Sequence, residues 1–378
     1  MPPGAEFAAA LDEAWRAGSA VLPLDPFAPA VDRERTLAAM QPEAGVDDDI
    51  ALVITTSGST GRPKGAELSH AALAASARAT MARIGQRDDD CWLACLPWHH
   101  IGGLQVLLRA RLFGTPLVVH ERFDVERVAA EADVTLVSLV PTQLLRLLDA
   151  GVDLARFRAI LLGGAAAPPA LLERAAAAGA SVVTTYGMSE TCGGCVYDGS
   201  PLDDVEVRID ADGRVQLRGP VLMSRYRLAP ERTAEVLRDG WFVTSDLGRL
   251  GPDGRLSVHG RVDDVVVTGG ENVVTTDVAA VLAAHPRVTD AAVAAVADAE
   301  WGQRLVAVVV VTGSQPPSLD ELREWCRRTL PAAAAPRGLV VVDTIPKLAS
   351  GKPDRLAVQS IVDRSGSCSQ SGDTPSRS

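Results

Sequence analysis

The stretch TTSGSTGRPKG, from Thr55 to Gly65, follows the apolar run Ala51–Ile54 and contains three glycines, five hydroxyl residues and one lysine. Glycines let backbone N–H groups converge on an anion, and hydroxyl groups add further donors. The Walker A spacing G-x-x-x-x-G-K-[ST] is not satisfied, and Pro63 stands directly before Lys64. The stretch therefore predicts either a phosphate-binding loop of another type, with Lys64 balancing the charge, or an ordinary glycine- and serine-rich surface turn.

Length and composition limit the classes of protein to which the chain can belong. Its 378 residues, 47% of them hydrophobic, are enough for a large core and for two domains. The net charge of −11 argues against a dedicated nucleic-acid binder, which needs a basic face. No apolar run reaches the ~20 residues of a membrane span. Because the start also lacks a basic segment followed by an apolar core, we expect a cytoplasmic protein.

The cysteines allow two interpretations. Cys192 and Cys195 form a C-x-x-C, and Cys91 and Cys95 lie near His99. A zinc or redox site could use such residues. The alternative, free thiols beside glycine turns, is favoured because no second closely spaced C-x-x-C follows. We therefore predict no metal at these cysteines.

The chain up to about Val205 alternates short apolar segments with alanine-rich ones. Strand candidates separated by helix candidates of about ten residues predict parallel β-α-β units, with helices on the faces of the sheet. Ser69 is a candidate N-cap for the first of these helices. The expected strands are 51–56, 115–120, 134–140, 157–164 and 181–187, and the expected helices are 69–84, 124–132, 141–150 and 168–179.

From Val205 the pattern changes to antiparallel β structure, with hairpin signals at Asp212-Gly213 and Asp253-Gly254. After Arg261 a smaller α+β unit is expected, with helices at 276–285 and 318–330 and strands at 290–298 and 304–313. We therefore predict an α/β fold with a large N-terminal domain, residues 1–260, and a small C-terminal domain, residues 261–362. The polar segment 363–378 is expected to be disordered.

Three further motifs accompany the first loop. TTYGMSET (Thr184–Thr191) ends a predicted strand, where ligands bind in parallel sheets, and offers an aromatic face, a hydroxyl and a carboxylate suited to Mg²⁺. GWFVTSDLGRL (Gly240–Leu250) contains Asp246, and Arg261 follows it in the sequence. These two side chains can bind a ribose. IPKLASGKPDR (Ile345–Arg355) holds a lysine between a glycine and a proline.

In this order the four motifs resemble the acyl-adenylate-forming superfamily, from about residue 50 to residue 358. The resemblance implies that the first loop binds ATP phosphates, that Glu190 binds Mg²⁺ and that Lys352 is the adenylation lysine, with Glu190 and Lys64 as further catalytic groups. It implies a mobile small domain with its hinge at Asp263. The implied ATP-binding residues are Thr56, Ser57, Gly58, Ser59, Thr60, Gly61, Lys64, Gly163, Gly164, Ala165, Thr185, Tyr186, Gly187, Met188, Ser189, Asp246 and Arg261.

Within that superfamily the chain is similar to the o-succinylbenzoate (2-succinylbenzoate)–CoA ligases of menaquinone biosynthesis. The similar segments are Leu96–Ala110, Leu139–Leu148 and Ile160–Glu173. The resemblance implies that Arg109 binds the carboxylate of the acid that is not activated. It also implies that His100 and Gly187 line the acyl site, and that Gly269, Gly270 and Glu271 face the site during reaction with coenzyme A.

The resulting hypothesis is an enzyme that uses ATP, Mg²⁺ and coenzyme A in two steps. The carboxylate is adenylated with release of pyrophosphate, and the acyl group is then transferred to the thiol of coenzyme A. Two alternatives stay open: a CoA ligase for another aryl or fatty acid, and a non-catalytic nucleotide-binding regulator. The partners are small molecules, with no nucleic acid and no membrane span. The oligomeric state is left open, with a homodimer as one alternative.

Overall fold

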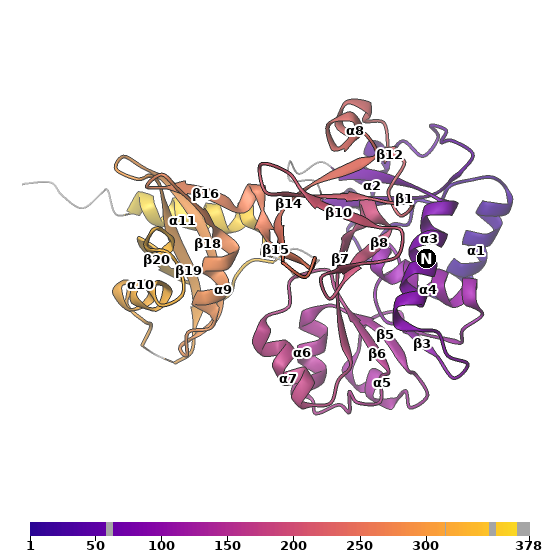
Figure 1. The fold of residues 1–378 in the computed structure, drawn as a ribbon, viewed down its shortest axis with the longest axis horizontal. Coiled ribbons are helices and arrows are strands. Elements are labelled where there is room, and N and C mark those ends of the chain that lie inside the picture. The colour runs from indigo at the N-terminus through magenta and orange to yellow at the C-terminus, as the bar shows by residue number, and fades with distance from the viewer. Residues whose placement is uncertain (58–62, 314, 348–352, 369–378) are drawn as a thin grey trace, which may run out of the picture. The chain divides into compact units, whose positions relative to one another are not determined.

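The computed structural model describes residues 1–57, 63–313, 315–347 and 353–368 (Figure 1). The chain divides into two compact units. The first consists of Met1–Thr244 and Leu250–Ser257, and the second of Ser245–Arg249 and the described residues from Val258 onward. The domain bounds predicted above, and the mobility of the small domain, stay predictions.

A seven-stranded sheet forms the centre of the first unit, in the order β4-β3-β5-β6-β7-β8-β9. The pairs from β4 to β7 are parallel, and β8 and β9 add antiparallel strands at one edge. The predicted parallel β-α-β arrangement is therefore confirmed for this sheet. Its strands are β3 Trp92–Ala94, β4 Leu117–Val119, β5 Leu136–Leu139, β6 Ala159–Leu162, β7 Val182–Met188, β8 Gly193–Tyr197 and β9 Ser200–Pro201.

Both faces of this sheet are covered, because its strands alternate apolar side chains between two hydrophobic clusters. Trp92 and Leu136 pack with α3 and α4, whereas Leu93 and Val137 pack with α5, α6 and α7. These helices are α3 His70–Ile84, α4 Ile101–Phe113, α5 Val125–Ala130, α6 Pro141–Asp149 and α7 Pro169–Ala177. The hydroxyl of Ser69 accepts a hydrogen bond from the N–H of Ala72, as the N-cap prediction requires.

The first predicted strand belongs to a different sheet. β1 (Ile50–Ser57) pairs antiparallel with β2 (Pro63–Ser69), which in turn pairs with β12 (Arg225–Tyr226). The expectation that the segment 51–56 joins the parallel series is therefore wrong. The sequence following Pro63 is itself a strand, so the chain reverses at the glycine-rich loop rather than entering a helix there.

A third sheet has the order β10-β11-β14-β13, with β15 paired to β14. Both predicted hairpins are confirmed, since β10 and β11 flank Asp212-Gly213 and β14 and β15 flank Asp253-Gly254. The strands are β10 Glu206–Ile209, β11 Arg214–Arg218, β13 Leu237–Arg238, β14 Trp241–Leu250 and β15 Leu256–Arg261. The remaining helices of the first unit are α1 Ala5–Arg16, α2 Ala30–Met40, α8 Pro230–Val236 and the 3₁₀ turn η1 Ser189–Thr191.

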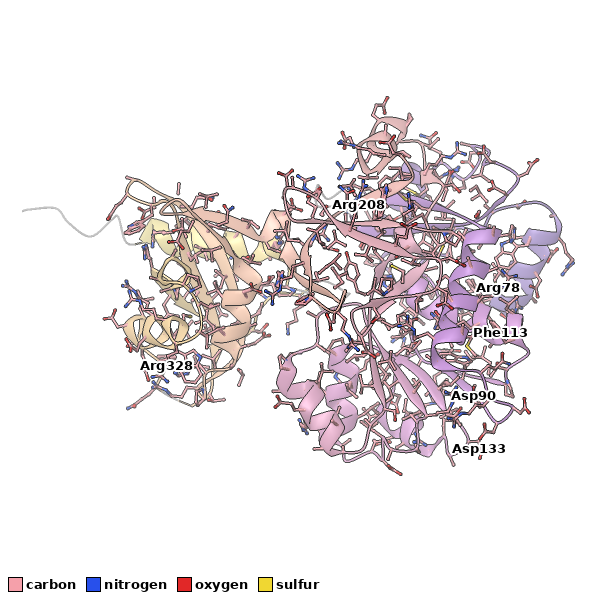
Figure 2. All side chains as sticks on the ribbon, viewed as in Figure 1. Arg78, Asp90, Phe113, Asp133, Arg208 and Arg328 are labelled. Carbon is pink, nitrogen blue, oxygen red and sulfur yellow. The ribbon has the colours of Figure 1, made fainter. Side chains whose placement is uncertain are left out.

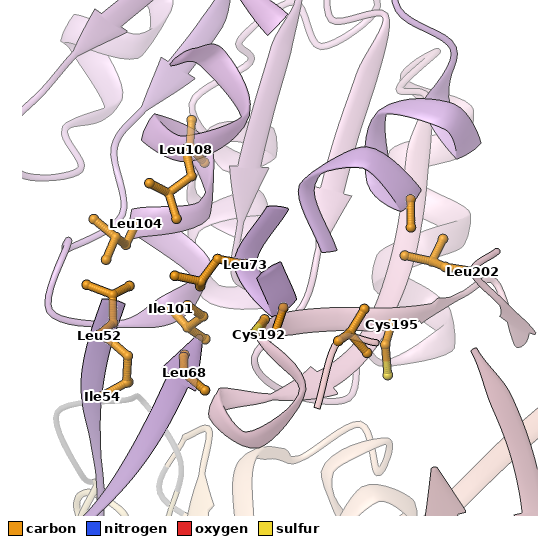
Figure 3. Close-up of a cluster of buried hydrophobic side chains, with 14 of the residues drawn as sticks. Leu52, Ile54, Leu68, Leu73, Ile101, Leu104, Leu108, Cys192, Cys195 and Leu202 are labelled. Carbon is orange, nitrogen blue, oxygen red and sulfur yellow. The ribbon is translucent and has the colours of Figure 1, made fainter. Parts of the chain in front are cut away.

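The largest core of the first unit joins the small β1-β2 sheet to the seven-stranded sheet through α3 and α4. In Figure 3, Leu52 and Leu68 of the paired strands face Leu73 of α3 and Leu104 of α4. All four are at most 3% exposed. Burying each such side chain contributes roughly 1.5–3 kcal/mol, so this cluster fixes the base of the glycine-rich loop against the main sheet.

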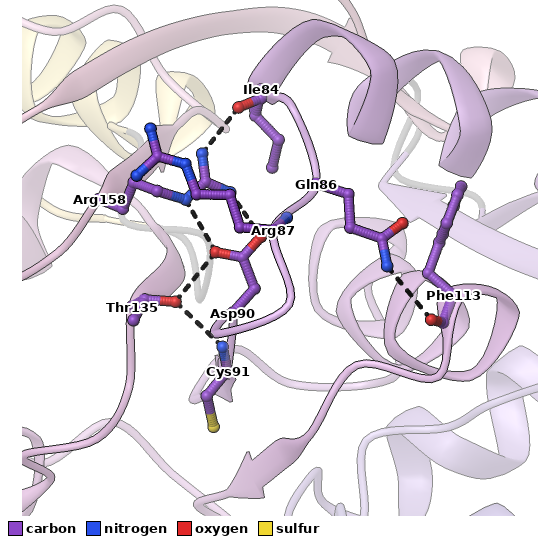
Figure 4. Close-up of polar contacts among 8 residues, drawn as sticks. All are labelled: Ile84, Gln86, Arg87, Asp90, Cys91, Phe113, Thr135 and Arg158. Carbon is purple, nitrogen blue, oxygen red and sulfur yellow. Dashed lines mark hydrogen bonds and ion pairs between the residues drawn. The ribbon is translucent and has the colours of Figure 1, made fainter.

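A buried ion pair fixes the loop before β3. The Arg158 side chain donates to both carboxylate oxygens of Asp90, at 2.8 and 2.6 Å, and Thr135 donates to the same carboxylate at 3.2 Å (Figure 4). Burial alone raises the pKa of Asp90, but these donors hold it below its ordinary value. The pair ties β3, β5 and the start of β6 together.

The second unit is built on the sheet β18-β19-β20, flanked on both faces. Successive residues of β19 enter different clusters: Leu305 and Ala307 pack with α9 and α10, and Val306 and Val308 pack with α11. A strand buried on both faces needs the continuous apolar run that its sequence has. The elements are η2 Val262–Asp264, β16 Val265–Thr268, β17 Glu271–Val274, α9 Thr275–Ala283, β18 Val288–Asp298, β19 Gly302–Val311, α10 Leu319–Arg327, η3 Ala332–Ala334, β20 Gly338–Val341 and α11 Arg355–Cys368.

The predicted disordered tail begins too early. Helix α11 extends to Cys368, so the first residues of the segment 363–378 are helical. The physical reason is packing, since Val358 and Val362 of this helix are buried against the sheet and the helix continues beyond them. Residues 369–378 lie outside the described ranges.

Charged side chains cover the surfaces of both units. The exposed Arg78, Asp133, Arg208 and Arg328 illustrate this in Figure 2. Among the described residues, no helix has the length and apolar character needed to cross a membrane.

Candidate active site

The antiparallel pairing of β1 and β2 closes the glycine-rich loop at its base. Thr56 lies opposite Lys64, and Ser57 lies opposite Pro63. Hairpin pairing therefore places the predicted phosphate-binding lysine next to the predicted hydroxyl of Thr56. The predicted Gly58, Ser59, Thr60 and Gly61 lie outside the described residues.

Glu190 and Lys64 meet at a residue that the sequence did not single out. The hydroxyl of Tyr226 donates to Oε1 of Glu190 at 2.6 Å. Nζ of Lys64 lies 5.9 Å from the centre of the Tyr226 ring. Tyr226 comes from β12, far along the chain from both partners, and no spacing pattern links the three. The structure therefore brings the predicted Mg²⁺-binding carboxylate and the predicted phosphate-binding lysine to one side chain.

The backbone around Glu190 is fixed by several hydrogen bonds. Glu190 lies in η1, directly after β7. Thr191 Oγ1 accepts from the N–H of Met188 at 2.9 Å, and the carbonyl of Glu190 accepts from the N–H of Met223 at 2.8 Å. The carboxylate therefore projects from a short rigid turn at the carboxyl end of a strand in the main sheet.

The predicted adenine-binding residues lie at the carboxyl ends of the parallel strands β6 and β7. Gly163 and Gly164 follow β6, and the half-buried Tyr186 lies in β7. A Cβ on Gly163 would lie 2.3 Å from Oγ1 of Thr185, and a Cβ on Gly187 would lie 2.0 Å from the carbonyl oxygen of Gly193. Neither contact is possible, so glycine is required at both positions for the strands to approach this closely.

The other predicted ATP-binding residues here, Thr185, Met188, Ser189 and Ala165, also lie at or near the ends of β6 and β7. Thr185 donates its hydroxyl to the carbonyl of Leu162 at 3.2 Å, which joins β7 to the end of β6. Met188 and Ser189 are half-buried at the start of η1, and Ala165 is exposed after β6. Together they lie around the carboxyl ends of β6 and β7.

The histidine pair lies between β3 and α4. The rings of His99 and His100 are 4.2 Å apart, and His100 directly precedes the helix. His100 is exposed, but desolvation of its ring and the neighbouring His99 imidazole lower its pKa to about 4. His100 is therefore uncharged at neutral pH and can contact an apolar or aromatic group.

Arg109 is buried, whereas an arginine on the surface of a helix would lie in solvent. It is 3% exposed, and its guanidinium carbon lies 5.5 Å from the centre of the Trp92 ring. Nε and Nη1 have no hydrogen-bond partner among the described residues. Burial lowers the pKa of Arg109. Two buried N–H donors without acceptors are a cost to the folded protein.

The two predicted ribose-binding residues both belong to the second unit. Nε of Arg261 lies 3.9 Å from Oδ1 of Asp246. The Asp246 side chain is 17% exposed and that of Arg261 is 48% exposed. A cation thus lies beside the carboxylate of Asp246.

The predicted hinge residue Asp263 lies in η2 beside a second aspartate. Arg355 pairs with Asp264 and lies 4.0 Å from Asp263. Lys352 lies outside the described residues, and a single bridge between Lys347 and Pro353 joins the residues on either side of that gap.

Gly269 and Gly270 form the tight turn between β16 and β17, and Glu271 begins β17. Both glycines have positive φ, 60° and 81°, as a two-residue hairpin turn of type I′ requires. A Cβ on Gly269 would lie 2.7 Å from the Trp301 ring, whereas a Cβ on Gly270 would meet nothing within 4 Å. The turn borders a cavity of about 540 Å³, which is lined by Gly269, Glu271, Trp301, Arg323, Arg327, Ala332, Ala333 and Arg337.

The cysteines with described side chains are free thiols. Cys192 and Cys195 are free and fully buried, and burial raises the pKa of both thiols, that of Cys195 to about 12. The carbonyl of Cys192 instead accepts hydrogen bonds from Ser76 and Gln105. In the described part of the chain, no three or more His, Cys, Asp or Glu side chains gather into a metal-binding group.

Two family models match the chain: "AMP-binding enzyme" over residues 28–227 and "AMP-binding enzyme C-terminal domain" over residues 277–352. A relative named probable 2-succinylbenzoate–CoA ligase, from Mycobacterium tuberculosis, is 46% identical over 88% of this chain and 91% of its own length.

Solved structures of the o-succinylbenzoate CoA synthetase (MenE) from Bacillus subtilis are also similar. The complex with the acyl-adenylate intermediate OSB-AMP has a TM-score of 0.87 and 28% identity, covering 95% of this chain and 86% of that one. The complex with ATP and magnesium ion has a TM-score of 0.79 and 30% identity, covering 93% and 82%.

Proposed function

This chain belongs to the AMP-binding enzyme family, and we propose that it catalyses the ATP-dependent ligation of 2-succinylbenzoate to coenzyme A in menaquinone biosynthesis. The predicted family is confirmed by the two matched models. The predicted reaction and subgroup are confirmed by the relative that is 46% identical over nearly the whole chain. The predicted fold class is confirmed by the match to the OSB-AMP complex. The roles of individual residues are proposals, developed below.

The first step joins the acid carboxylate to the α-phosphorus of ATP and breaks the bond to pyrophosphate. Two anions approach each other in this step, so the site must supply positive charge. Lys64 and the glycine-rich loop are proposed to stabilise the departing pyrophosphate. Lys352, which lies outside the described residues, is proposed to bridge the carboxylate and the α-phosphate.

The residues around Glu190 suit a magnesium ion that accompanies ATP. Mg²⁺ in nucleotide sites takes one or two carboxylates together with substrate phosphates and water. Glu190 presents one such carboxylate from a rigid turn, with one oxygen held by Tyr226. The bound ion would neutralise phosphate charge, while Glu190 orients it.

The family resemblance supports proposed roles for several residues in recognition of the nucleoside. In the first unit, Gly163–Ala165 and Tyr186 are proposed to enclose the adenine at the carboxyl edge of the main sheet. In the second unit, Asp246 is proposed to accept hydrogen bonds from the ribose hydroxyls, with Arg261 orienting its carboxylate.

In the second step the thiol of coenzyme A attacks the acyl-adenylate carbonyl and AMP leaves. We propose that Asp263 is the hinge for a rotation that replaces Lys352 with the turn at Gly269–Glu271. The cavity beside this turn contains Arg323, Arg327 and Arg337. Guanidinium groups bind phosphate well, so this cavity suits the phosphate-rich end of coenzyme A.

2-Succinylbenzoate carries two carboxylates, of which only one is activated. The buried Arg109 lacks acceptors for Nε and Nη1 among the described residues, and a carboxylate can accept two parallel hydrogen bonds from a guanidinium. Arg109 is therefore proposed to hold the aromatic carboxylate, and the uncharged His100 to line the acyl site. This buried cation is the observation in the structure that best supports a dicarboxylic acid as the substrate.

One assay tests the proposal. The full chain is incubated with ATP, Mg²⁺ and a panel of acids, and pyrophosphate release and CoA-dependent AMP formation are followed. Turnover with 2-succinylbenzoate is expected. Turnover only with benzoates or fatty acids would contradict the substrate, and no pyrophosphate with any acid would favour a nucleotide-binding regulator.

We also propose a cytoplasmic location, where ATP and coenzyme A are available. The small-molecule partners follow from the reaction, and a homodimer stays one alternative for the assembly.

A further inference from the structure

We propose that Tyr226 is a positioning residue for the Mg²⁺-binding carboxylate of Glu190 and couples it to Lys64. The inference rests on the proposed function, because it takes Glu190 and Lys64 as groups that face the ATP phosphates. Tyr226 itself lies in none of the four motifs that indicated the reaction.

Tyr226 is held from several sides. It is 5% exposed, and its backbone pairs with Ala66 of β2, only two residues from Lys64. Its N–H donates to Oγ1 of Thr233 at 3.0 Å. The ring therefore has one defined position between the strand that leaves the glycine-rich loop and the turn that carries Glu190.

The hydrogen bond to Glu190 determines which carboxylate oxygen a cation can use. At 2.6 Å the phenol hydroxyl donates to Oε1, in the range of strong hydrogen bonds to ionised acceptors. Because Oε1 accepts this hydrogen bond from Tyr226, we take Oε2 as the ligand for the ion. A carboxylate fixed in this way binds through one oxygen, as suits Mg²⁺, which keeps several waters.

The ring of Tyr226 contacts Lys64, the lysine at the base of the glycine-rich loop. Lys64 Nζ lies 5.9 Å from the ring centre, within the range of cation–π attraction. One side chain thus holds a cation through its ring and an anion through its hydroxyl.

The test separates the hydroxyl from the ring. Tyr226→Phe removes only the hydrogen bond, and Tyr226→Leu removes the ring as well. The first readout is the dissociation constant of Mn²⁺, used as a spin-active substitute for Mg²⁺, from the protein in complex with a non-hydrolysable ATP analogue. Removing a group that orients a metal ligand typically weakens metal binding about 10- to 100-fold, and we expect that loss for Tyr226→Phe. Tyr226→Leu should additionally weaken binding of the analogue at saturating metal.

The second readout is the Mg²⁺ dependence of pyrophosphate release. Tyr226→Phe should raise the half-saturating Mg²⁺ concentration by the same factor and keep the rate at saturating Mg²⁺. A merely structural role would lower that rate at every Mg²⁺ concentration. In a Glu190→Gln background, Tyr226→Phe should change Mn²⁺ binding no further, because the partner is already gone.

Tyr197→Phe is the matched control. Tyr197 is also buried, and its hydroxyl is 2.9 Å from Oγ1 of Thr80, so the variant loses a phenol hydrogen bond elsewhere in the same unit. Its Mn²⁺ binding should equal that of the unsubstituted protein. If Tyr226→Phe does not fold, Thr233→Val, which loosens the Tyr226 backbone, should give a smaller change of the same sign.

Unchanged Mn²⁺ binding in Tyr226→Phe overturns the proposal, whatever the turnover. Weakened Mn²⁺ binding in a protein that turns over no acid upholds the metal-positioning role and contradicts the proposed function instead.

Discussion

Arg109 places its guanidinium carbon 5.5 Å from the centre of the Trp92 ring, inside the packing between helix α4 and the main sheet. A cation is rarely buried without an anion to pair with it. Nε and Nη1 lack acceptors among the described residues, which lowers the stability of the free protein, and the proposed ligand carboxylate would supply those acceptors.

Arg109→Met should therefore separate stability from substrate binding. The apparent KM for 2-succinylbenzoate should rise about 10- to 100-fold, the effect of losing a charged hydrogen bond worth roughly 1.5–3 kcal/mol. The KM for ATP should hardly change. In the absence of substrate the melting temperature should rise, because the buried charge is gone.

The control for Arg109 is Arg111→Met. Arg111 lies on the same helix but is partly exposed and paired with Asp12 at 2.6 Å. It should leave both KM values unchanged. An equal rise in the KM for ATP and for the acid in Arg109→Met would contradict the assigned role.

Lys352→Ala tests the assignment that rests wholly on the family resemblance. If the lysine contributes roughly 3–4 kcal/mol to the transition state, adenylation should slow by about 10²–10³-fold. Thioester formation from preformed acyl-adenylate should proceed at the normal rate, since the lysine acts in the first step. Single-turnover assays of each half-reaction measure this, and a matching loss in both would exclude a role confined to adenylation.

Asp90→Asn should destabilise the first unit by about 3–5 kcal/mol at pH 7, because it leaves Arg158 without its buried partner. The folded protein lowers the pKa of Asp90 below its ordinary value of 3.8. The stabilisation is therefore fully present above pH 3.8 and is lost as the pH falls through the lowered value.

Urea unfolding across this pH range measures the free energy of unfolding of both proteins. The difference between the variant and the unsubstituted protein should become smaller only at the acid end. Asp149→Asn breaks an exposed pair with Arg174 and should cost at most about 1 kcal/mol. If this difference in the free energy of unfolding already becomes smaller near neutral pH, a group other than Asp90 is responsible for the pH dependence.

Gly269→Ala and Gly270→Ala form a matched pair in the turn proposed to face coenzyme A. Both glycines have positive φ, but only at Gly269 would a Cβ meet the Trp301 ring. Gly269→Ala should thus slow thioester formation more than Gly270→Ala, with adenylation unaffected in both. Stopped-flow measurement of each step gives the comparison, and equal effects would mean that strain in the turn, rather than displacement of Trp301, is decisive.

Several features of the fold could be predicted because they depend on neighbours in sequence. Helix α3 with its Ser69 cap, the hairpin at Asp212-Gly213 and the doubly buried strand β19 each follow from local periodicity and turn residues. The parallel sheet follows from strands alternating with helices. Pairing of β1 did not follow, because a short apolar strand carries no information about which sheet it joins.

The same distinction applies to the candidate site. The order of the four motifs was enough to identify the family and the reaction, since each motif is a continuous stretch of residues. The burial of Arg109 and the contacts of Tyr226 with Glu190 and Lys64 were not accessible in this way. Tyr226 of β12 contacts residues of β2 and η1, and Arg109 of α4 contacts Trp92 of β3. Only tertiary packing brings such distant segments together.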